Sequence, residues 1–293
     1  MRLFLGLLTL AFGFRDLSTR RVAIITGGTR GIGRGIAEAL VEDGNTDLLL
    51  TYCSDTYSAV KFANELEETH DCTVKLIRGD ISKKSVRDDI WYCFDRMKSP
   101  LGVLVHNAGQ YVGITSDNSE GITAPVSPHM FGSGYTEGRE IVMLYYIKLY
   151  GEAFTDLCEN ALTRMWHGGS IVGISSPGCT TQYRPQPGYD LPGSGKCVME
   201  YAMRLFALKA AQKNVNCNVV IPGVTLTGAW YKMADGRNQD IEETIGQAVE
   251  QLVPMKKHMA PRQVGDVVNF LCSEKGRFIT GVSLPADGGV HLR

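Results

Sequence analysis

A glycine-rich turn near the start of the chain has the residue types and spacing that hold the phosphates of a nucleotide. It reads TGGTRGIG over residues 26–33 and joins an apolar, strand-like run at 22–25 to a helix-like segment at 34–42. This order directs several backbone N–H groups and a helix N-terminus at one point, where a pyrophosphate can sit. We therefore expect a dinucleotide to be bound by Gly27, Thr29, Arg30, Gly31, Ile32 and Gly33.

The end of the second predicted strand, at 47–52, indicates which dinucleotide this is. An Asp or Glu there would accept hydrogen bonds from the ribose hydroxyls of NAD and would repel a 2′-phosphate. Tyr52 and Ser54 occupy this place instead, and the first carboxylate is that of Asp55. Arg30 carries a guanidinium, which suits a phosphate. These residues favour NADP(H) over NAD(H), whereas an Arg30 that only faced solvent would leave the preference open.

Alternating apolar strands and amphipathic helices continue over most of the chain and predict an α/β fold. This pattern is typical of a Rossmann-like, doubly wound parallel sheet with helices on both faces. No repeat or low-complexity linker interrupts it, so we expect a single dinucleotide-binding domain over residues 21–293. The seven or so expected strands lie at 22–25, 47–52, 74–80, 101–107, 170–175, 215–221 and 279–285.

The composition and charge exclude several other classes of function. The net charge is −1, so nothing favours nucleic acid or an anionic membrane as a partner. The eight cysteines show no paired close spacing and fit a reducing compartment, for which we expect the cytoplasm. The six histidines fall at no ligand spacing, so we expect no metal. A small-molecule substrate is the expected partner.

Residues 1–20 form an apolar N-terminal extension. Residues 1–14 combine one basic residue with a short apolar run that resembles a signal peptide but is too short to span a bilayer as a helix. No small-x-small cleavage site follows. The segment could be a weak membrane-surface anchor, an apolar arm packed on the protein, or an artefact of gene prediction, and membrane contact is not the favoured interpretation.

Five further motifs follow the glycine turn in order. They read GDIS at 79–82, HNAG at 106–109, GSIVGISS at 169–176, PGVTLT at 222–227 and DGG at 287–289. With the glycine turn, they resemble the short-chain dehydrogenase/reductase family from about Arg21 to Gly289. The resemblance implies that Asp80 and Ile81 lie at the adenine, that Asn107, Ala108 and Gly109 lie beneath the adenosine ribose, and that Pro222, Gly223, Val224 and Thr227 hold the nicotinamide carboxamide.

The resemblance also implies a catalytic set of Asn, Ser, Tyr and Lys. In the family the tyrosine exchanges a proton with the substrate oxygen, the serine holds that oxygen, the lysine grips the nicotinamide ribose, and the asparagine supports a water chain. Ser176 matches the serine and Lys196 the lysine. Pro192 stands where the tyrosine is expected, and Lys148 takes the asparagine position. Two lysines would then face a pocket that normally holds one. His106 stands where a second Asn is frequent, and we expect it to make a local hydrogen bond rather than to act in catalysis.

Tyr189 is a displaced candidate for the missing acid. It precedes Lys196 by seven residues, which on a helix separates the two by roughly 10 Å instead of roughly 6 Å. Pro192, Gly193 and Gly195 also predict that no continuous helix runs through this segment. Tyr189 would act only if its loop folded back over the nicotinamide, and Tyr183 is a weaker candidate.

A site that can aim a hydride but lacks its usual proton donor favours particular acceptors. Reduction of a ketone develops an alkoxide that needs a proton or an oxyanion partner, whereas hydride addition to an iminium gives a neutral amine. We therefore expect an NADPH-dependent reductase of a secondary metabolite that acts on a C=N, iminium or activated carbonyl group. The alternatives are a cofactor-assisted cyclase or isomerase and a redox-silent NADP(H)-binding protein.

The proline also gives the chain a partial resemblance to the fungal reductase/Diels–Alderases of bridged indole alkaloid biosynthesis. Pro192 and Gly195 fit their Pro-x-x-Gly pattern. Gly193 lacks the acidic residue of that branch, and Lys196 replaces an aromatic one. The resemblance implies a repurposed site rather than a particular substrate.

Two regions outside the motifs carry further expectations. An insertion at about 110–140 is rich in Gly, Ser, Pro and Asn. Long loops in such domains tend to be functional, so we expect it to border the substrate pocket unless it is a disordered surface insertion. The predicted helix at 196–211 is apolar over much of its surface and would pack against a partner subunit in a homodimer or homotetramer, unless these residues only face the sheet. They are Val198, Met199, Ala202, Met203, Leu205 and Phe206.

Overall fold

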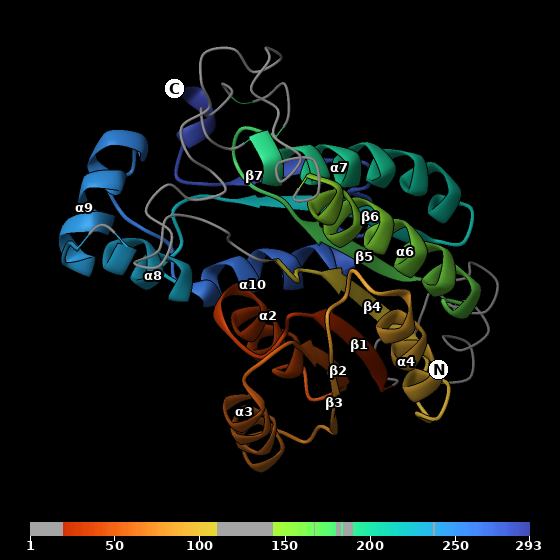
Figure 1. Cartoon of the computed structure of the whole chain (residues 1–293). Coiled ribbons are helices and arrows are strands. Elements are labelled where there is room, and N and C mark those ends of the chain that lie inside the picture. Colours follow the sequence, from red (N-terminus) through yellow and green to blue (C-terminus); the bar gives the residue numbers. More distant parts are fainter. Residues whose placement is uncertain (1–19, 110–142, 167, 180–182, 184–189, 237) are drawn as a thin grey trace.

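Within the described part of the chain, seven parallel strands form one sheet at the centre of the fold (Figure 1). The computed structural model describes residues 20–109, 143–166, 168–179, 183, 190–236 and 238–293. The strands lie in the order β3-β2-β1-β4-β5-β6-β7, which confirms the predicted fold class. They are β1 (Arg21–Thr26), β2 (Thr46–Tyr52), β3 (Val74–Arg78), β4 (Leu101–His106), β5 (Gly169–Ile174), β6 (Val215–Pro222) and β7 (Ser283–Ala286), the last beginning four residues later than predicted.

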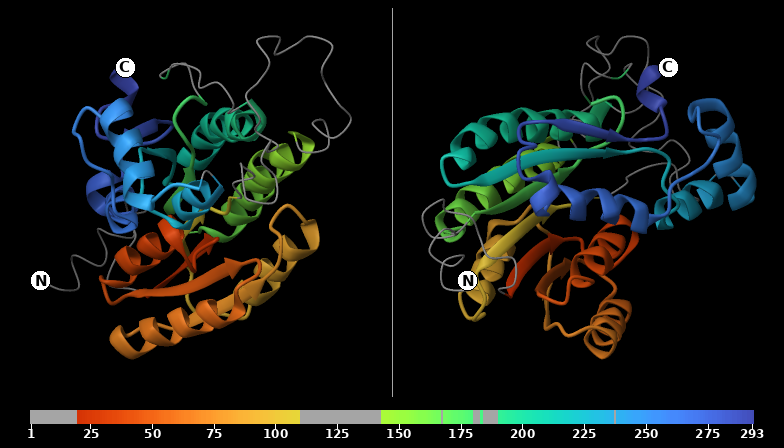
Figure 2. Two further views of the ribbon diagram at one scale, coloured as in Figure 1. Left: turned by 60° about the vertical axis from the view of Figure 1, so that its left-hand side comes forward. Right: turned by 180° about the vertical axis from the view of Figure 1, so that it is seen from behind.

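Helices cover both faces of the sheet (Figures 1 and 2). The residues of β1 and β4 are all buried, as in central strands of parallel sheets that are covered on both sides. One core packs against α4 (Lys84–Phe94), α6 (Ala153–Arg164) and α7 (Asp190–Ala211), and the other against α2 (Gly31–Val41), α3 (Thr56–Thr69) and α10 (Pro261–Leu271). The remaining elements are η1 (Ile147–Glu152), α8 (Gly228–Gly236), α9 (Ile241–Leu252), η2 (Glu274–Gly276) and η3 (Val290–Leu292).

The strand order reverses between β1 and β4, which are neighbours although β2 and β3 separate them in the chain. Thr26 at the end of β1 pairs with His106 at the end of β4. Chains that leave two neighbouring parallel strands in opposite directions open a crevice beyond their carboxyl ends, where α/β proteins bind ligands. The glycine turn and residues 107–109 therefore begin side by side at this crevice.

A buried arginine ties the helices on one face to the loop after β3. The side chain of Arg87 on α4 is almost fully buried and pairs with Asp156 at 2.7 Å and with Glu152 at 2.9 Å. It also donates to the carbonyl oxygens of Ile81 at 3.0 Å and Ser82 at 2.9 Å. Loss of these acceptors would leave the buried Arg87 guanidinium without partners, which is strongly destabilising, although Glu152 itself is half exposed. Arg87 thus fixes the loop that carries the predicted adenine contacts.

The start of α7 differs from the sequence-based prediction. The helix begins at Asp190 and runs without a break through Pro192, Gly193 and Gly195. Proline is tolerated in the first turn of a helix because its missing N–H would have no partner there. A Cβ on Gly195 would lie 2.2 Å from the carbonyl oxygen of Tyr146, so this glycine permits a close approach to the neighbouring helix. The prediction of a broken helix was wrong because the close packing at Gly195 outweighs the low helix propensity of this segment.

The apolar surface of α7 is divided between the core and the exterior. Met199 and Met203 are fully buried and Phe206 nearly so, and all three belong to the protein's own core. The prediction that these three face a partner is therefore wrong. Val198 and Leu205 are exposed, together with Tyr201 and Leu208, while Ala202 is partly buried. Within the described part of the chain, no helix has the length and apolar character needed to cross a membrane.

Candidate active site

The glycine turn forms a tight cradle between β1 and α2. Gly27 and Gly31 adopt positive φ values of 63° and 52°, which side chains disfavour. A Cβ on Gly33 would lie 2.1 Å from the carbonyl oxygen of Gly27, so the turn folds directly onto the helix start. Thr227, distant in sequence, lies against Gly31, where an added Cβ would be 3.5 Å from the Thr227 methyl group. The turn and the 222–227 motif therefore border the same space.

A hydrogen-bond network joins the ends of β1 and β4. The Asn107 side chain donates to the carbonyl oxygens of Thr26 at 3.1 Å and Gly27 at 3.0 Å. The backbone N–H groups of Asn107 and Ala108 donate to Thr26 Oγ1 at 3.0 and 2.9 Å. The Nε2 of His106 donates to the carbonyl oxygen of Leu149 at 3.0 Å, so its Nδ1 accepts from the Thr26 hydroxyl, also at 3.0 Å. His106 makes local hydrogen bonds, as predicted.

The end of β2 has the composition of a phosphate site. Asp55 is committed to the N-terminus of α3, where its carboxylate accepts from the N–H of Ser58 at 3.0 Å and its pKa is lowered by that bond. Arg30 is exposed at the N-cap of α2. Arg78 donates from Nε to the carbonyl oxygen of Cys53 at 3.4 Å. Sequence reasoning missed Arg78, which the β2–β3 pairing places beside Tyr52.

The loop after β3 holds the predicted adenine contacts. An oxygen of Asp80 accepts from the N–H of Ser82 at 3.0 Å, and Ile81 is buried. Tyr145, from the helical turn before η1, hydrogen-bonds Asp80, and burial first, then Asp80, raises the pKa of its phenol to about 12. Sequence analysis missed Tyr145 because no motif surrounds it.

Ser176 and Lys196 meet beyond the carboxyl end of β5. The Lys196 ammonium donates to Ser176 Oγ at 2.7 Å and lies 4.9 Å from the centroid of the Tyr150 ring. Lys196 is only 8% exposed, and this burial lowers its pKa to about 8, against the opposing influence of Cys179 and Glu200. Pro192 lies on the same helix one turn before Lys196 and has no proton to donate. The structure thus brings together two of the predicted catalytic residues.

Comparison with known proteins agrees with this geometry. Residues 27–291 match the family model described as enoyl-(acyl carrier protein) reductase. The chain belongs to the short-chain dehydrogenase/reductase family. It is 26% identical to a tetrahydroxynaphthalene reductase, PfmaG, of Pestalotiopsis fici, over 92% of this chain and 91% of that protein.

Two solved structures of the family are similar in fold. L-sorbose reductase of Gluconobacter frateurii, solved with NADPH and L-sorbose, has a TM-score of 0.77 and 21% identity and covers 93% of this chain and 97% of its own. A blue fluorescent protein from a metagenomic library, solved with NADPH, has a TM-score of 0.75 and 25% identity and covers 94% and 99%. The family fold therefore extends over nearly the whole chain.

The other predicted catalytic residues of this short-chain dehydrogenase/reductase are placed differently. Lys148 is exposed on η1, so the predicted pair of lysines divides into one exposed and one buried side chain. Tyr189 and the whole insertion at 110–140 lie outside the described residues. Tyr183 is buried and donates to Asp287 at 2.6 Å, and burial followed by this bond raises its pKa. Tyr183 thus serves the packing of the C-terminal segment.

A buried carboxylate that sequence analysis missed lies one helical turn after Lys196. Glu200 accepts hydrogen bonds from Ser175 and from Ser283, the latter at 2.7 Å, and burial raises its pKa. The signal that the sequence offered was a glutamate four residues after the lysine, next to the apolar Met199 and three residues before Met203. Glu200 supplies a negative group that faces the Lys196 ammonium.

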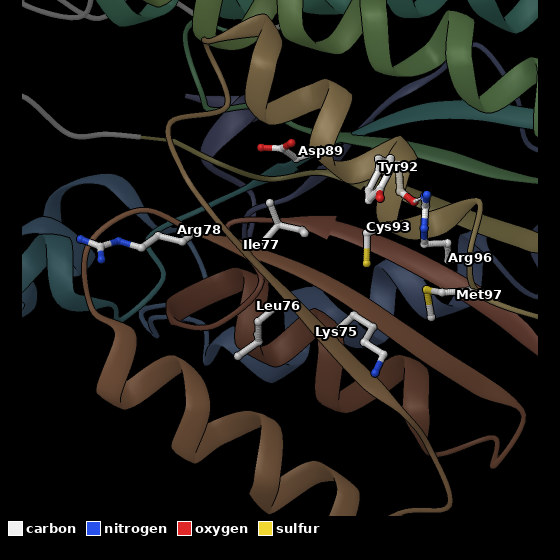
Figure 3. A pocket seen from close by; sticks show the side chains of 9 residues that line it. All are labelled: Lys75, Leu76, Ile77, Arg78, Asp89, Tyr92, Cys93, Arg96 and Met97. Atoms are coloured by element: carbon white, nitrogen blue, oxygen red, sulfur yellow. Dashed lines mark hydrogen bonds between the residues drawn. The ribbon is translucent and has the colours of Figure 1, made fainter.

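A groove of about 540 Å³ lies elsewhere, along the edge strand β3 and α4 (Figure 3). In the sheet order, β2, β1 and β4 separate this strand from β5, which leads to Ser176. Arg78 extends away from the other labelled side chains in Figure 3, toward the end of β2. The groove is therefore separate from Ser176 and Lys196, and of its lining residues only Arg78 also belongs to the candidate cofactor site.

Proposed function

We propose that this chain is an NADPH-dependent reductase of a small molecule of secondary metabolism. The observation that carries the proposal is the 2.7 Å contact between Lys196 and Ser176. It lies beyond the carboxyl ends of the strands, where the glycine turn also lies. Hydride transfer to a C=N, iminium or activated carbonyl group is the proposed reaction. The hydroxynaphthalene-reducing relative supports a substrate from secondary metabolism. A cytoplasmic location belongs to the same proposal.

The residues present fit NADP(H). The glycine turn folds tightly onto the start of α2, because a Cβ at Gly33 would collide with the carbonyl oxygen of Gly27, and a turn of this kind at a helix N-terminus suits a pyrophosphate. Arg78 donates to the Cys53 carbonyl oxygen at the end of β2, and the pKa of the nearby Asp55 is lowered by its Ser58 hydrogen bond and, less, by the charge of Arg30. The two guanidinium groups would offset this carboxylate and bind a 2′-phosphate. Tyr52, Ser54, Asp80, Ile81 and the 222–227 motif complete the proposed contacts. NADPH, when bound, supplies the hydride.

The chain's own residues position the acceptor. The Ser176 hydroxyl is half-buried beyond β5 and would bind the oxygen or nitrogen of the reacting group. Lys196 holds that hydroxyl in place through its hydrogen bond. Lys148 and Tyr189 stay proposed contributors, Lys148 as a charge at the rim and Tyr189 as an acid if its loop covers the nicotinamide.

Cofactor titration tests the proposal. The purified protein is titrated with NADPH and NADH by nucleotide fluorescence, alongside Arg30→Ala. We expect NADPH to bind more tightly than NADH, and Arg30→Ala to remove about tenfold of that preference, because a charge-assisted contact contributes about 1.5–3 kcal/mol before solvent screening. Binding of neither nucleotide would contradict the proposal and favour a redox-silent protein. Product formation without oxidation of NADPH would identify a cyclase or isomerase instead.

The exposed face of α7 supports a homo-oligomer. Its apolar members are Val198, Tyr201, Leu205 and Leu208. Their spacing of three or four residues places them along one stripe of the helix. We propose that this stripe packs against a second copy of the chain in a homodimer or homotetramer.

A further inference from the structure

The lysine of this site contacts the serine directly. The resemblance to the family assigns the lysine to the nicotinamide ribose and to a neighbouring tyrosine, but here Pro192 stands one turn earlier on α7. The Lys196 ammonium donates to Ser176 Oγ at 2.7 Å. A hydroxyl that accepts from an ammonium has its own O–H free to donate to a substrate oxygen. The pair is therefore arranged as a two-step proton path.

We propose that Lys196 supplies, through the Ser176 hydroxyl, the proton that a ketone substrate takes up on reduction. The inference rests on the proposed reductase function and narrows its acceptor to a carbonyl group. Lys196 acts through Ser176 and does not touch the substrate oxygen itself. Ser176 takes the place of the absent tyrosine at that oxygen.

Among the described titratable groups around Ser176, Lys196 is the one whose protonation changes near neutral pH. Glu200 on α7, Cys179 after β5, His106 on β4 and Tyr150 on η1 face it. Burial lowers the pKa of His106 to about 4 and raises that of Cys179 to about 12, so both stay neutral at physiological pH. Burial lowers the pKa of Lys196 to about 8, close to the value at which a general acid works best near neutrality.

The proposed step balances in atoms and electrons. The carbonyl carbon receives a hydride from NADPH, which becomes NADP⁺, and the C=O π electrons move to the oxygen. Ser176 gives its hydroxyl proton to that oxygen while Lys196 passes an ammonium proton to Ser176 Oγ. The neutral Lys196 amine then regains a proton from water. An iminium acceptor needs only the hydride, so its reduction does not use this path.

Two acceptors that differ in this requirement test the inference. Ethyl benzoylformate takes a hydride and a proton, whereas the N-methyl-3,4-dihydroisoquinolinium cation takes a hydride alone. With saturating NADPH, we expect Lys196→Ala to slow reduction of the ketone by about 10²-fold, as for loss of a general acid. Added methylamine should restore it, and reduction of the iminium should not respond to methylamine. Lys61→Ala, an exposed lysine on α3, is the matched control.

Two more variants distinguish the proton path from Lys196 to Ser176 from proton donation by the neighbouring Tyr150. Ser176→Ala should impair ketone reduction without rescue by methylamine, because the relay atom is gone. Tyr150→Phe keeps the ring against Lys196 and removes only the hydroxyl group. We expect this variant to reduce the ketone as the native protein does, with the same fall in rate at alkaline pH. If Tyr150→Phe abolishes that reduction as Lys196→Ala does, the phenol is the donor and the proposal is overturned.

A titration that needs no substrate completes the test. The ¹⁵Nζ NMR signal of Lys196, assigned with Lys196→Arg, should titrate near pH 8 and move to lower pH in Ser176→Ala. An ordinary lysine pKa overturns the proposal. Reduction of the iminium alone also overturns it but leaves the proposed reductase function intact. If NADPH binds and neither acceptor is reduced, both fail.

Discussion

His106 Nε2 lies 3.0 Å from the carbonyl oxygen of Leu149, so the last residue of β4 holds the π-helical turn η1 against the sheet. Its other ring nitrogen accepts from Thr26, beside the glycine turn. A single neutral imidazole thus joins the cofactor cradle to the helix that carries Tyr150. Protonation would replace the acceptor at Nδ1 with a donor and break this link.

Acid should therefore weaken the native protein more than the His106→Asn variant. Burial, with smaller effects of Lys196 and Arg87, lowers the pKa of His106 to about 4, below its unfolded value of 6.5. The unfolded state binds more protons between these values, so the free energy of unfolding falls as the pH drops from 6.5 to 4, by about 3 kcal/mol. Urea unfolding at pH 7.0, 5.5 and 4.5 measures this. Equal pH slopes in the two proteins would show that His106 is not a buried neutral base.

Arg78 should contribute to the preference for NADPH. It lies 3.4 Å from the Cys53 carbonyl oxygen at the end of β2 and is exposed. We expect Arg78→Ala to weaken NADPH binding by about tenfold and NADH binding little, because an exposed charge contact is partly screened. Arg96→Ala is the matched control, since this exposed guanidinium stacks over Tyr92 in the groove of Figure 3. Equal losses for both nucleotides would place Arg78 outside the 2′-phosphate site.

The residues that sequence analysis found and missed differ in how they come together. The glycine turn, Asn107 and Ser176 follow strand ends directly, so the order of strands along the chain placed them at one edge of the sheet. Arg78 reaches the end of β2 only through the pairing of Tyr52 with Arg78. Tyr145 meets Asp80 only through the packing of its helix. Such tertiary contacts leave no spacing in the sequence from which to predict them.

At the start of α7, local helix propensity led the sequence-based prediction astray. Proline and two glycines within four residues lower helix propensity, yet the helix forms because tertiary packing outweighs it. The site depends on this, since a continuous helix fixes Pro192 and Lys196 one turn apart. Helix propensity correctly identified this segment as a weak helix former. It could not reveal that Gly195 packs closely against the carbonyl group of Tyr146.

The exposed stripe of α7 should control the oligomeric state. Leu205 and Leu208 are 54% and 74% exposed in the single chain, an unfavourable state for neighbouring leucines. We expect Leu205→Glu combined with Leu208→Glu to convert the oligomer to monomers at micromolar concentration, as measured by light scattering after size exclusion. Leu252→Glu on α9, at a comparably exposed leucine, should leave the mass unchanged. A native protein that is already monomeric would contradict the proposed interface.

Removal of the Lys196 charge should stabilise the protein at neutral pH. The pKa of this lysine is about 8 in the folded protein and 10.5 in the unfolded chain. The unfolded state therefore binds more protons between these values, and the free energy of unfolding rises with pH over this interval. Below pH 8 the folded protein bears the full cost of the buried charge, so we expect Lys196→Met to gain about 3 kcal/mol at pH 7.

That gain should vanish by about pH 10.5, where the lysine is neutral in both states. Urea unfolding at pH 7, 8.5 and 10 measures the difference, and Lys61→Met on α3 controls for loss of an exposed lysine. A variant less stable than the native protein at pH 7 would mean that Ser176 and Glu200 compensate the buried ammonium fully. A gain in stability together with the loss of ketone reduction would instead show that the fold retains a destabilising charge because the reaction uses it.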